Sequence, residues 1–260
     1  MRPLFLLAND DGVRSAGLQA LRRSLLHVGD VVVCAPDSEQ SAASHALSLH
    51  RPLRLTRHAE GEYSLDGTPA DCVYVALHAE QRVLPRRPDL VVSGLNHGLN
   101  LGDDVFYSGT VAAAREGALR RLPALAVSAD HRAELGAAAR VAARLALAML
   151  RDGCAPGTLL NVNFPPGREW RLRATRLGTR TYEDLVEFRR DPRGREYLWI
   201  GGSGVDHAPV AGSDTEAYDE GVIGVTPLVL DLWGRSTMSA AESVIETERG
   251  LPVDAAAGSV

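Results

Sequence analysis

Short apolar segments alternate with amphipathic segments along the first two thirds of the chain. The apolar segments are predicted strands, at residues 4–8, 31–35, 88–94, 124–129 and 158–165. The segments between them have apolar residues at helical spacing and are predicted helices, at residues 16–28, 71–80, 109–121 and 134–153. Strands that alternate with helices are typical of a parallel sheet with helices on both faces. The sequence therefore predicts an α/β fold in three layers.

The pattern changes after about residue 166. Residues 169–179 and 196–202 are predicted extended strands joined by a polar hairpin, and residues 213–234 combine a short acidic helix with a strand. We interpret residues from about 170 to 230 as an arm of the same domain. Five of the chain's 13 aromatic residues lie in it: Trp170, Tyr182, Phe188, Tyr197 and Trp199. Because aromatic residues and arginine are enriched in subunit interfaces, the arm predicts a homo-oligomer; the alternative is an arm folded back on its own domain.

Residues 1–238 are thus predicted to form one domain, and the small, polar residues 239–260 a disordered tail. Three cysteines lie far apart without a CxxC pair, which favours a reducing compartment and a cytoplasmic protein. The N-terminus lacks the pattern of a secretory signal. Since no run of about 18 apolar residues occurs, we expect no membrane span.

The chain contains no lysine, and all 28 of its basic residues are arginine. P-loop nucleotide binding and Schiff-base chemistry both need a lysine, so both are excluded. A phosphate group would have to be held by backbone N–H groups, hydroxyls, arginine or a metal ion. The formal net charge of -5, without a basic stripe, argues against nucleic acid as an obligate partner.

Two adjacent carboxylates, Asp10 and Asp11, follow the first predicted strand. Ligands of parallel α/β sheets bind at the carboxyl ends of strands, which is where this pair lies. Asn-Asp-Asp-Gly is also good turn sequence, and an aspartate can cap the following helix. Adjacent carboxylates near a strand end are costly to bury unless a cation compensates them. Oxygen ligands of this kind suit Mg²⁺, Mn²⁺ or Ca²⁺.

Two further loops follow strands of the same predicted sheet. The loop after residues 31–35 is rich in hydroxyls, and Ser41 or Ser44 would bring an oxygen to the same site; the alternative is a solvated loop. The loop after residues 88–94 repeats glycine and asparagine, so its backbone can approach a ligand closely. A loop of that length without its own secondary structure is usually functional.

The third loop ends in Tyr-Ser-Gly-Thr, directly before the predicted helix at residues 109–121. The hydroxyl and N–H groups of Ser108, Gly109 and Thr110 at a helix N-terminus form an anion site. The alternative is that Ser108 or Thr110 only caps the helix. Because the three loops follow strands of one sheet, we expect them to meet at one edge. A cation beside a phosphate site is the layout of metal-assisted phosphoryl hydrolysis.

Four segments carry a family resemblance: NDDG, APDSEQSA, GTPADCV and SGLNHGLNLGDDVFYSGTVAAAREG. In this order they resemble the SurE family of stationary-phase survival-protein nucleotidases, and NVNFP and GVIGVTPL fit its later segments. The resemblance implies a Rossmann-like core and a metal-dependent phosphatase for nucleoside 5′- and 3′-monophosphates. It also implies dimers or tetramers that exchange C-terminal segments. Short polyphosphate is a further substrate that such families admit.

The resemblance further implies one divalent ion per subunit, Mg²⁺ or Mn²⁺. Its implied ligands are Asp10, Asp11, Ser41 and Asn96. Asp10 and Asp11 are then the predicted catalytic residues, one of which orients or deprotonates the attacking water. The predicted phosphate contacts are Asn9, Ser108, Gly109 and Thr110.

Two other functions would use similar features. A nucleotide sensor would bind the same ligand without hydrolysis, and turnover of any nucleoside monophosphate would eliminate it. A receiver-like signalling domain also has an acidic pair after its first strand. It needs a lysine after a later strand, however, and this chain has none.

Overall fold

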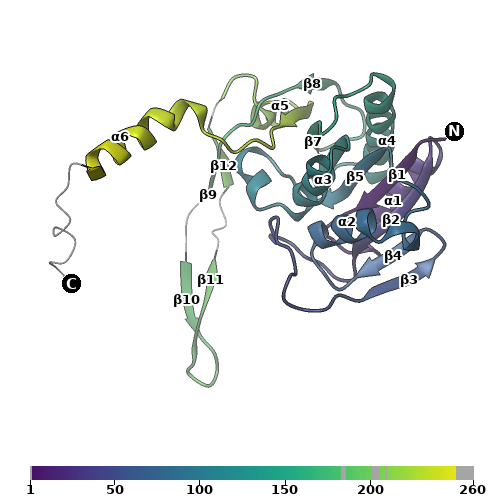
Figure 1. Ribbon diagram of the computed structural model, residues 1–260, viewed down its shortest axis with the longest axis horizontal. Helices are drawn as coiled ribbons and strands as arrows, with labels where there is room; N and C mark the ends of the chain where they lie inside the picture. The colour runs from purple at the N-terminus through teal and green to yellow at the C-terminus, as the bar shows by residue number, and fades with distance from the viewer. Residues whose placement is uncertain (1, 183–185, 201–204, 209, 250–260) are drawn as a thin grey trace. The chain divides into compact units, whose positions relative to one another are not determined.

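A nine-stranded sheet forms the centre of residues 1–228 (Figure 1). The computed structural model describes residues 2–182, 186–200, 205–208 and 210–249. In spatial order the strands are β3 (Leu55–Ala59), β4 (Glu62–Leu65), β2 (Asp30–Pro36), β1 (Leu4–Ala8), β5 (Leu90–His97), β6 (Ala124–Ala129), β7 (Leu159–Phe164), β13 (Ile223–Leu228) and β8 (Leu172–Ala174). All neighbours are parallel except the pairs β3–β4 and β7–β13. The predicted mostly parallel sheet is confirmed.

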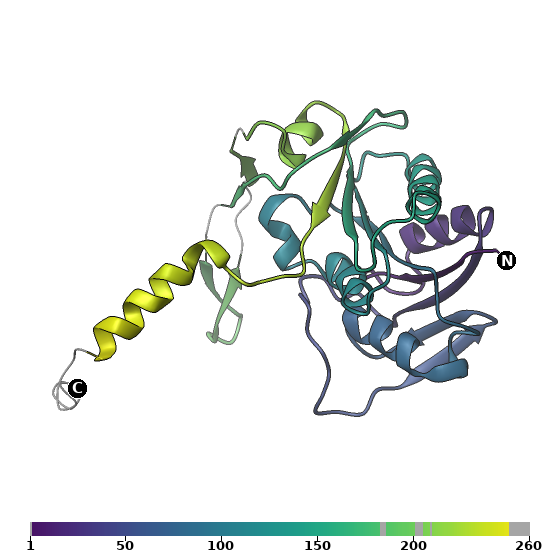
Figure 2. The same cartoon turned by 45° about the horizontal axis from the view of Figure 1, so that its top comes forward.

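Helices cover both faces of this sheet (Figure 1 and Figure 2). On one face α1 (Ala16–Leu26) and α4 (Leu135–Arg151) pack against each other and the strands, and on the other α2 (Pro69–His78) packs beside α3 (Gly109–Leu119). Every residue of β1 and β6 is buried, as expected for parallel strands between two helical layers. The predicted three-layer, Rossmann-like arrangement is therefore confirmed.

The strands β3 and β4 were not predicted from the sequence. All five residues of β3 are exposed, and polar residues interrupt the apolar pattern of the segment. Its pairing depends on β4, which joins the edge of the sheet beside β2. A strand that is specified by its neighbour in this way leaves no strong signal in the sequence.

The C-terminal strands are partly those predicted. A hairpin forms between β10 (Val186–Arg190) and β11 (Glu196–Ile200), and α5 (Asp214–Asp219) is the expected acidic helix. The predicted strand at residues 169–179, however, does not pair with 196–202. Part of it is β8, which pairs with β13 in the main sheet, and β9 (Arg180–Tyr182) pairs with β12 (Val205–His207).

Among the described residues, 229–249 belong to a unit apart from residues 1–228, and the predicted domain end at residue 238 stays a prediction. Disorder was predicted for residues 239–260, but the structure differs: it describes α6 (Met238–Arg249). Alanine and glutamate favour a helix there despite the low apolar content. Residues 250–260 of the predicted tail lie outside the described residues.

Three short 3₁₀ segments complete the described elements: η1 (Glu80–Arg82), η2 (Gly102–Phe106) and η3 (Arg235–Thr237). Of these, η2 lies in the glycine-asparagine loop and leads to the N-terminus of α3. Among the described residues, no helix has the length and apolar character needed to cross a membrane.

Candidate functional site

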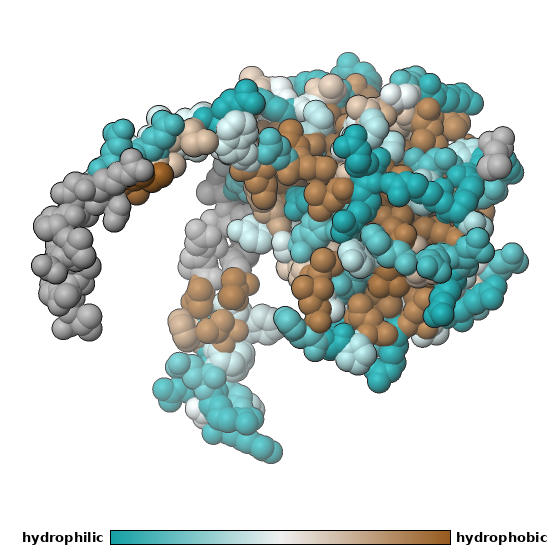
Figure 3. Space-filling model, viewed as in Figure 1, coloured by the Kyte–Doolittle hydropathy of each residue, from teal (hydrophilic) through white to brown (hydrophobic). Residues whose placement is uncertain are grey.

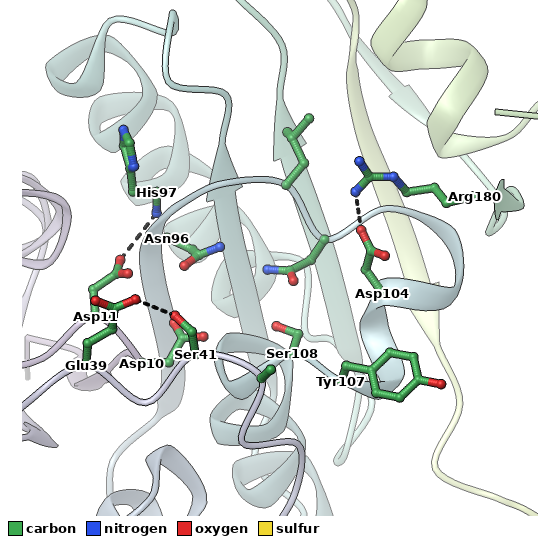
Figure 4. Close-up of a pocket in the computed structure, with 13 residues that line it drawn as sticks. Asp10, Asp11, Glu39, Ser41, Asn96, His97, Asp104, Tyr107, Ser108 and Arg180 are labelled. Atoms are coloured by element: carbon green, nitrogen blue, oxygen red, sulfur yellow. Dashed lines mark hydrogen bonds and ion pairs between the residues drawn. The ribbon is translucent and has the colours of Figure 1, made fainter. Parts of the chain in front are cut away.

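The carboxyl ends of β1 and β5 and the loop after β2 surround a cavity of about 460 Å³ (Figure 4). Its lining includes Asp10, Asp11, Glu39, Ser41, Asn96, His97, Asn100, Asp104, Tyr107, Ser108 and Arg180. The three loops therefore meet at one edge of the sheet, as predicted. All four predicted metal ligands line the same cavity.

Asp10 lies just after β1 with only 5% of its surface exposed. Its Oδ2 accepts the N–H of Thr110 at 3.0 Å, and its Oδ1 accepts the Thr110 hydroxyl. Both donors belong to the first turn of α3, whose positive end favours a carboxylate. Burial nevertheless raises the pKa of Asp10 to about 6; the Thr110 hydrogen bond opposes this shift and the Asp11 charge adds to it. Its neighbours therefore compensate the Asp10 anion only in part.

Asp11 is less buried and faces the same cavity. Its Oδ2 accepts the backbone N–H of His97 at 3.2 Å. Burial raises the pKa of Asp11, the His97 N–H lowers it, and the Glu39 charge raises it. Within the described part of the chain, neither Asp10 nor Asp11 forms an ion pair with an arginine or histidine side chain.

Ser41 stands on the loop after β2, where its Oγ donates to Glu39 Oε1 at 2.7 Å. The N–H of Gln40 donates to the Asp10 carbonyl at 2.8 Å, which holds the loop against the end of β1. Ser44, the other serine considered from the sequence, donates its N–H and hydroxyl to carbonyls at the end of η2. Ser41 therefore lines the cavity, whereas Ser44 fixes the loop.

Asn96 reaches the cavity because β5 continues past its predicted end at residue 94. The pairing of β5 with β6 shifts register just before Asn96, where Gly94 has a φ of +129°. A Cβ on Gly94 would lie 2.3 Å from the Val127 carbonyl oxygen, so only glycine allows this approach. The Asn96 Nδ2 donates to the Gly98 carbonyl at 3.0 Å, which leaves Oδ1 as the atom that could bind a cation.

Of the four predicted phosphate contacts, Ser108 lines the cavity. It is the N-cap of α3: its Oγ accepts the N–H of Val111 at 3.0 Å, and its own hydroxyl hydrogen can still be donated. Gly109 and Thr110 are buried and contact Asp10 instead. A Cβ on Gly109 would lie 2.8 Å from the Asp10 Cβ, so this glycine lets α3 approach the carboxylate. Phosphate binding by Gly109 and Thr110 stays a prediction.

Asn9 has a structural role beside the site. It is fully buried, and its Nδ2 donates to the Gly12 carbonyl at 3.0 Å and to Ser15 Oγ at 2.8 Å. These bonds close the turn after β1 and fix the N-cap residue of α1. The turn interpretation of Asn-Asp-Asp-Gly is therefore correct for Asn9, and its phosphate role also stays a prediction.

Buried asparagines anchor the long loop between β5 and α3. Asn100 donates its N–H to Asn163 Oδ1 at 2.8 Å and its Nδ2 to Ser128 Oγ at 2.7 Å. Its carbonyl accepts from Asn161 and Asn163. Because buried hydrogen-bond networks fix a single arrangement, the loop is held rigidly over the ends of β6 and β7. The asparagines of the segment NVNFP thus support the site without reaching the cavity.

The donor set at the cavity fits a hard divalent cation. Two carboxylates, a serine hydroxyl and an amide oxygen are oxygen ligands only, which suits Mg²⁺ or Mn²⁺. Among the described residues, no group of three or more His, Cys, Asp or Glu side chains is placed to hold a metal. The set therefore consists of two charged and two neutral oxygen donors, and the two negative charges match one divalent ion.

Three charged residues of the lining were not identified from the sequence: Glu39, Asp104 and Arg180. Glu39 lies two residues before Ser41, and Asp104 belongs to a second Asp-Asp pair, so both had a local signal. Arg180 had none, because its place in the cavity depends on how β9 packs beside η2.

Comparisons with known proteins all lead to one family. The family described as "Survival protein SurE" matches residues 5–184. The 5′-nucleotidase SurE of Sorangium cellulosum is 65% identical over 237 residues, which cover 90% of this chain and 92% of that protein. The corresponding protein of Anaeromyxobacter dehalogenans is 54% identical over 230 residues, covering 87% and 89%. The crystal structure of the SurE protein from Aquifex aeolicus superposes with a TM-score of 0.80 at 37% identity, covering 94% of this chain and 100% of that one.

Proposed function

Because the chain belongs to the SurE family, we propose that it is a metal-dependent phosphatase that hydrolyses nucleoside 5′- and 3′-monophosphates to nucleoside and phosphate. One observation carries the proposal: Asp10 and Asp11 lie together at a cavity, with raised pKa values and no ion-pair partner among the described residues. The relatives named as 5′-nucleotidases support the nucleotide substrate. Short polyphosphate is a further substrate of this proposal.

In this proposal Asp10, Asp11, Ser41 and Asn96 hold one Mg²⁺ or Mn²⁺ per subunit. When bound, such an ion polarises a phosphate oxygen and lowers the pKa of a bound water. The fit rests on the all-oxygen donor set and on the two carboxylates that no described side-chain cation compensates.

The protein's own side chains orient the metal ligand, the attacking water and the phosphate group. Thr110 holds both oxygens of Asp10, so Asp10 is fixed in orientation. Asp11 is more exposed and can orient the attacking water or accept its proton. Ser108 can donate its hydroxyl to the phosphate, and the N-terminus of α3 favours the negative charge of that group.

The test is a phosphate-release assay over nucleoside 5′- and 3′-monophosphates and short polyphosphate, run with Mg²⁺, with Mn²⁺ and with chelator. We expect turnover that chelator abolishes and that either ion restores. Full activity after exhaustive chelation and dialysis would contradict the metal proposal. Nucleotide binding without turnover of any phosphate ester would favour a sensor instead.

We also propose that the protein is a cytoplasmic homo-oligomer, a dimer or tetramer, assembled through the β10–β11 hairpin. Opposed residues of an antiparallel pair share a face, so Val186 with Ile200 and Phe188 with Leu198 make one apolar face. Their exposed fractions run from 48% to 85%, and apolar side chains gather on this hairpin in Figure 3. A two-stranded ribbon alone in water is only marginally stable, which favours burial of its apolar face against a second copy.

The proposed cytoplasmic location is supported by the cysteines, which are free thiols, as expected in a reducing compartment.

Light scattering on Phe188→Asp tests the assembly. We expect this variant to dissociate while Arg189→Asp, which changes the opposite face of β10, stays assembled. A monomeric intact protein at micromolar concentration would contradict the assembly proposal and leave the chemistry untouched.

A further inference from the structure

We propose that Arg180 binds the phosphate group of the substrate from the side of the cavity opposite Asp10 and Asp11. This inference rests on the proposed phosphatase function and adds a recognition residue to it. Figure 4 shows Arg180 and Asp104 across the cavity from the acidic pair, with Ser108 between the two groups.

The charge of the cavity is the first reason. Four carboxylates line it, those of Asp10, Asp11, Glu39 and Asp104, and Arg180 is the one arginine in the described lining. The chain has no lysine to take this role. Because a phosphate monoester enters as an anion, a cationic donor besides any metal ion would offset the charge of these carboxylates. The planar guanidinium, with donors in a fork, matches the oxygens of a phosphate group.

The position of Arg180 is the second reason. Its Nη1 pairs with Asp104 Oδ2, and the two side chains are only 14% and 12% exposed. The carbonyl of Asp104 accepts the N–H of Ser108 at 3.0 Å. The ion pair is thus joined directly to the residue that caps α3, where the anion site was predicted. The guanidinium carries its five N–H donors in a planar fork, which suits an anion at this N-terminus.

The backbone behind Arg180 is held rigidly, which is the third reason. Asp214, buried in α5, accepts the Gly178 N–H at Oδ1 at 2.7 Å and the Gly102 N–H at Oδ2 at 3.0 Å. A Cβ on Gly102 would lie 2.8 Å from the Gly178 carbonyl oxygen, so these two segments touch. The start of β9 and the start of η2 are therefore fixed together, and with them the ion pair that they carry.

Two alternatives must be separated from phosphate binding. Arg180 could serve only to neutralise Asp104. It also lines a neighbouring hollow of about 340 Å³ with His97, Leu99 and His131, where it could contact the nucleoside instead. If Arg180 contacts the phosphate, its loss weakens binding of every phosphate ester and of free phosphate. If it contacts the nucleoside, its loss weakens binding of nucleotides alone. If it only neutralises Asp104, its loss weakens binding of neither.

The experiment compares wild type with Arg180→Lys, which keeps the charge beside Asp104 but loses the fork. A double variant, Arg180→Ala with Asp104→Ala, removes both charges of the pair together. Arg144→Lys, at an exposed site on α4, is the matched control. The measurements are kcat and KM for p-nitrophenyl phosphate and adenosine monophosphate, calorimetric binding of inorganic phosphate with Mn²⁺ present, Mn²⁺ affinity, and circular dichroism.

In both Arg180 variants we expect phosphate binding to weaken about tenfold or more, as for loss of a charge-assisted hydrogen bond. The kcat/KM should fall by a similar factor for both esters, while the circular dichroism spectrum and Mn²⁺ affinity stay within about twofold of wild type. Phosphate affinity unchanged in both variants overturns the inference. So does a loss confined to adenosine monophosphate, or an equal loss of Mn²⁺ affinity. If wild type turns over no ester, the proposed function fails, and phosphate calorimetry still decides the role of Arg180.

Discussion

Asp10 and Asp130 occupy comparable places in the sheet but meet opposite electrostatic environments. Each follows a buried parallel strand, β1 for Asp10 and β6 for Asp130, and each is itself buried. Burial raises the pKa of Asp10 to about 6. Burial would also raise the pKa of Asp130, but hydrogen bonds from Arg132 and from the Tyr218 hydroxyl, the latter at 2.7 Å, hold it well below its usual range.

The difference distinguishes a structural carboxylate, that of Asp130, from the carboxylate of Asp10, whose charge a bound ligand would compensate. Asp130 already has the positive charge and donors that make a buried anion stable, so it joins β6 to the segment that contains Tyr218. Asp10 lies beside a second carboxylate, and its described donors are the two groups of Thr110. A buried carboxylate such as that of Asp10 is costly unless a cation compensates its charge. Ionisable groups in clefts with strongly shifted pKa values are candidates for functional residues.

The largest expected effect is on turnover. Asp10→Asn and Asp11→Asn should each lower kcat/KM by about a thousandfold or more, because each removes a charged ligand of the proposed ion. Asp130→Asn should keep kcat/KM within about tenfold at a temperature where it is folded. The assay is phosphate release with Mn²⁺ present. Comparable losses in all three variants would remove the distinction between the two carboxylates.

For the free energy of unfolding we expect the opposite order, with a larger loss in Asp130→Asn than in Asp11→Asn. Asp130→Asn is expected to lower the free energy of unfolding by about 2 kcal/mol, because it weakens the acceptor shared by Arg132 and Tyr218. Asp11→Asn in metal-free protein should be neutral or stabilising by about 0.5 kcal/mol, since it relieves repulsion of Asp10 and Glu39. Urea unfolding with chelator measures both. If Asp11→Asn collapses the fold, the acidic pair is a structural turn.

The pH dependence of stability should also differ in sign. The folded-state pKa of Asp10 is above the ordinary 3.8, so its contribution to the free energy of unfolding falls as pH rises from about 4 to 6. The folded-state pKa of Asp130 is below 3.8, so its contribution is present above about pH 4 and is lost as pH falls further. For metal-free protein, the stability gap between wild type and Asp10→Asn should change by about 2 kcal/mol across pH 4 to 6. A flat gap would show that burial of Asp10 is already compensated.

A smaller effect than the loss of either carboxylate is expected at Thr110, which holds Asp10 without lining the cavity. Thr110→Val removes the hydroxyl donor and keeps the shape, so Mn²⁺ affinity should fall about tenfold, the worth of one hydrogen bond to a charged group. Thr110→Ser should restore most of it. Mn²⁺ affinity in Thr110→Val equal to that of wild type would mean that Asp10 needs no support from α3.

The contrast also explains what the sequence could predict. Apolar periodicity was sufficient for the parallel sheet and its helices, and Asp10 and Asp11 follow the end of a strand, where ligands of such sheets bind. Ser41 and Asn96 were predicted as metal ligands only from the family resemblance. The β3–β4 pair escaped prediction because its strands are specified by a neighbour. Arg180 escaped because its place depends on the tertiary packing of β9 and η2. The compensation of Asp130 by Tyr218 likewise joins residues 88 apart in sequence, which no local pattern reveals.

The central claim is that the acidic pair after β1 holds a cation, and calorimetric titration with Mn²⁺ tests it most directly. Wild type, Asp11→Asn and Asp130→Asn would be titrated at pH 7.5 after chelation and dialysis, with no substrate present. We predict one Mn²⁺ per subunit in wild type and Asp130→Asn, and binding weakened at least about a hundredfold in Asp11→Asn, as expected for loss of a charged ligand. Equal Mn²⁺ affinity in wild type and Asp11→Asn, or no Mn²⁺ binding by wild type, would contradict the account.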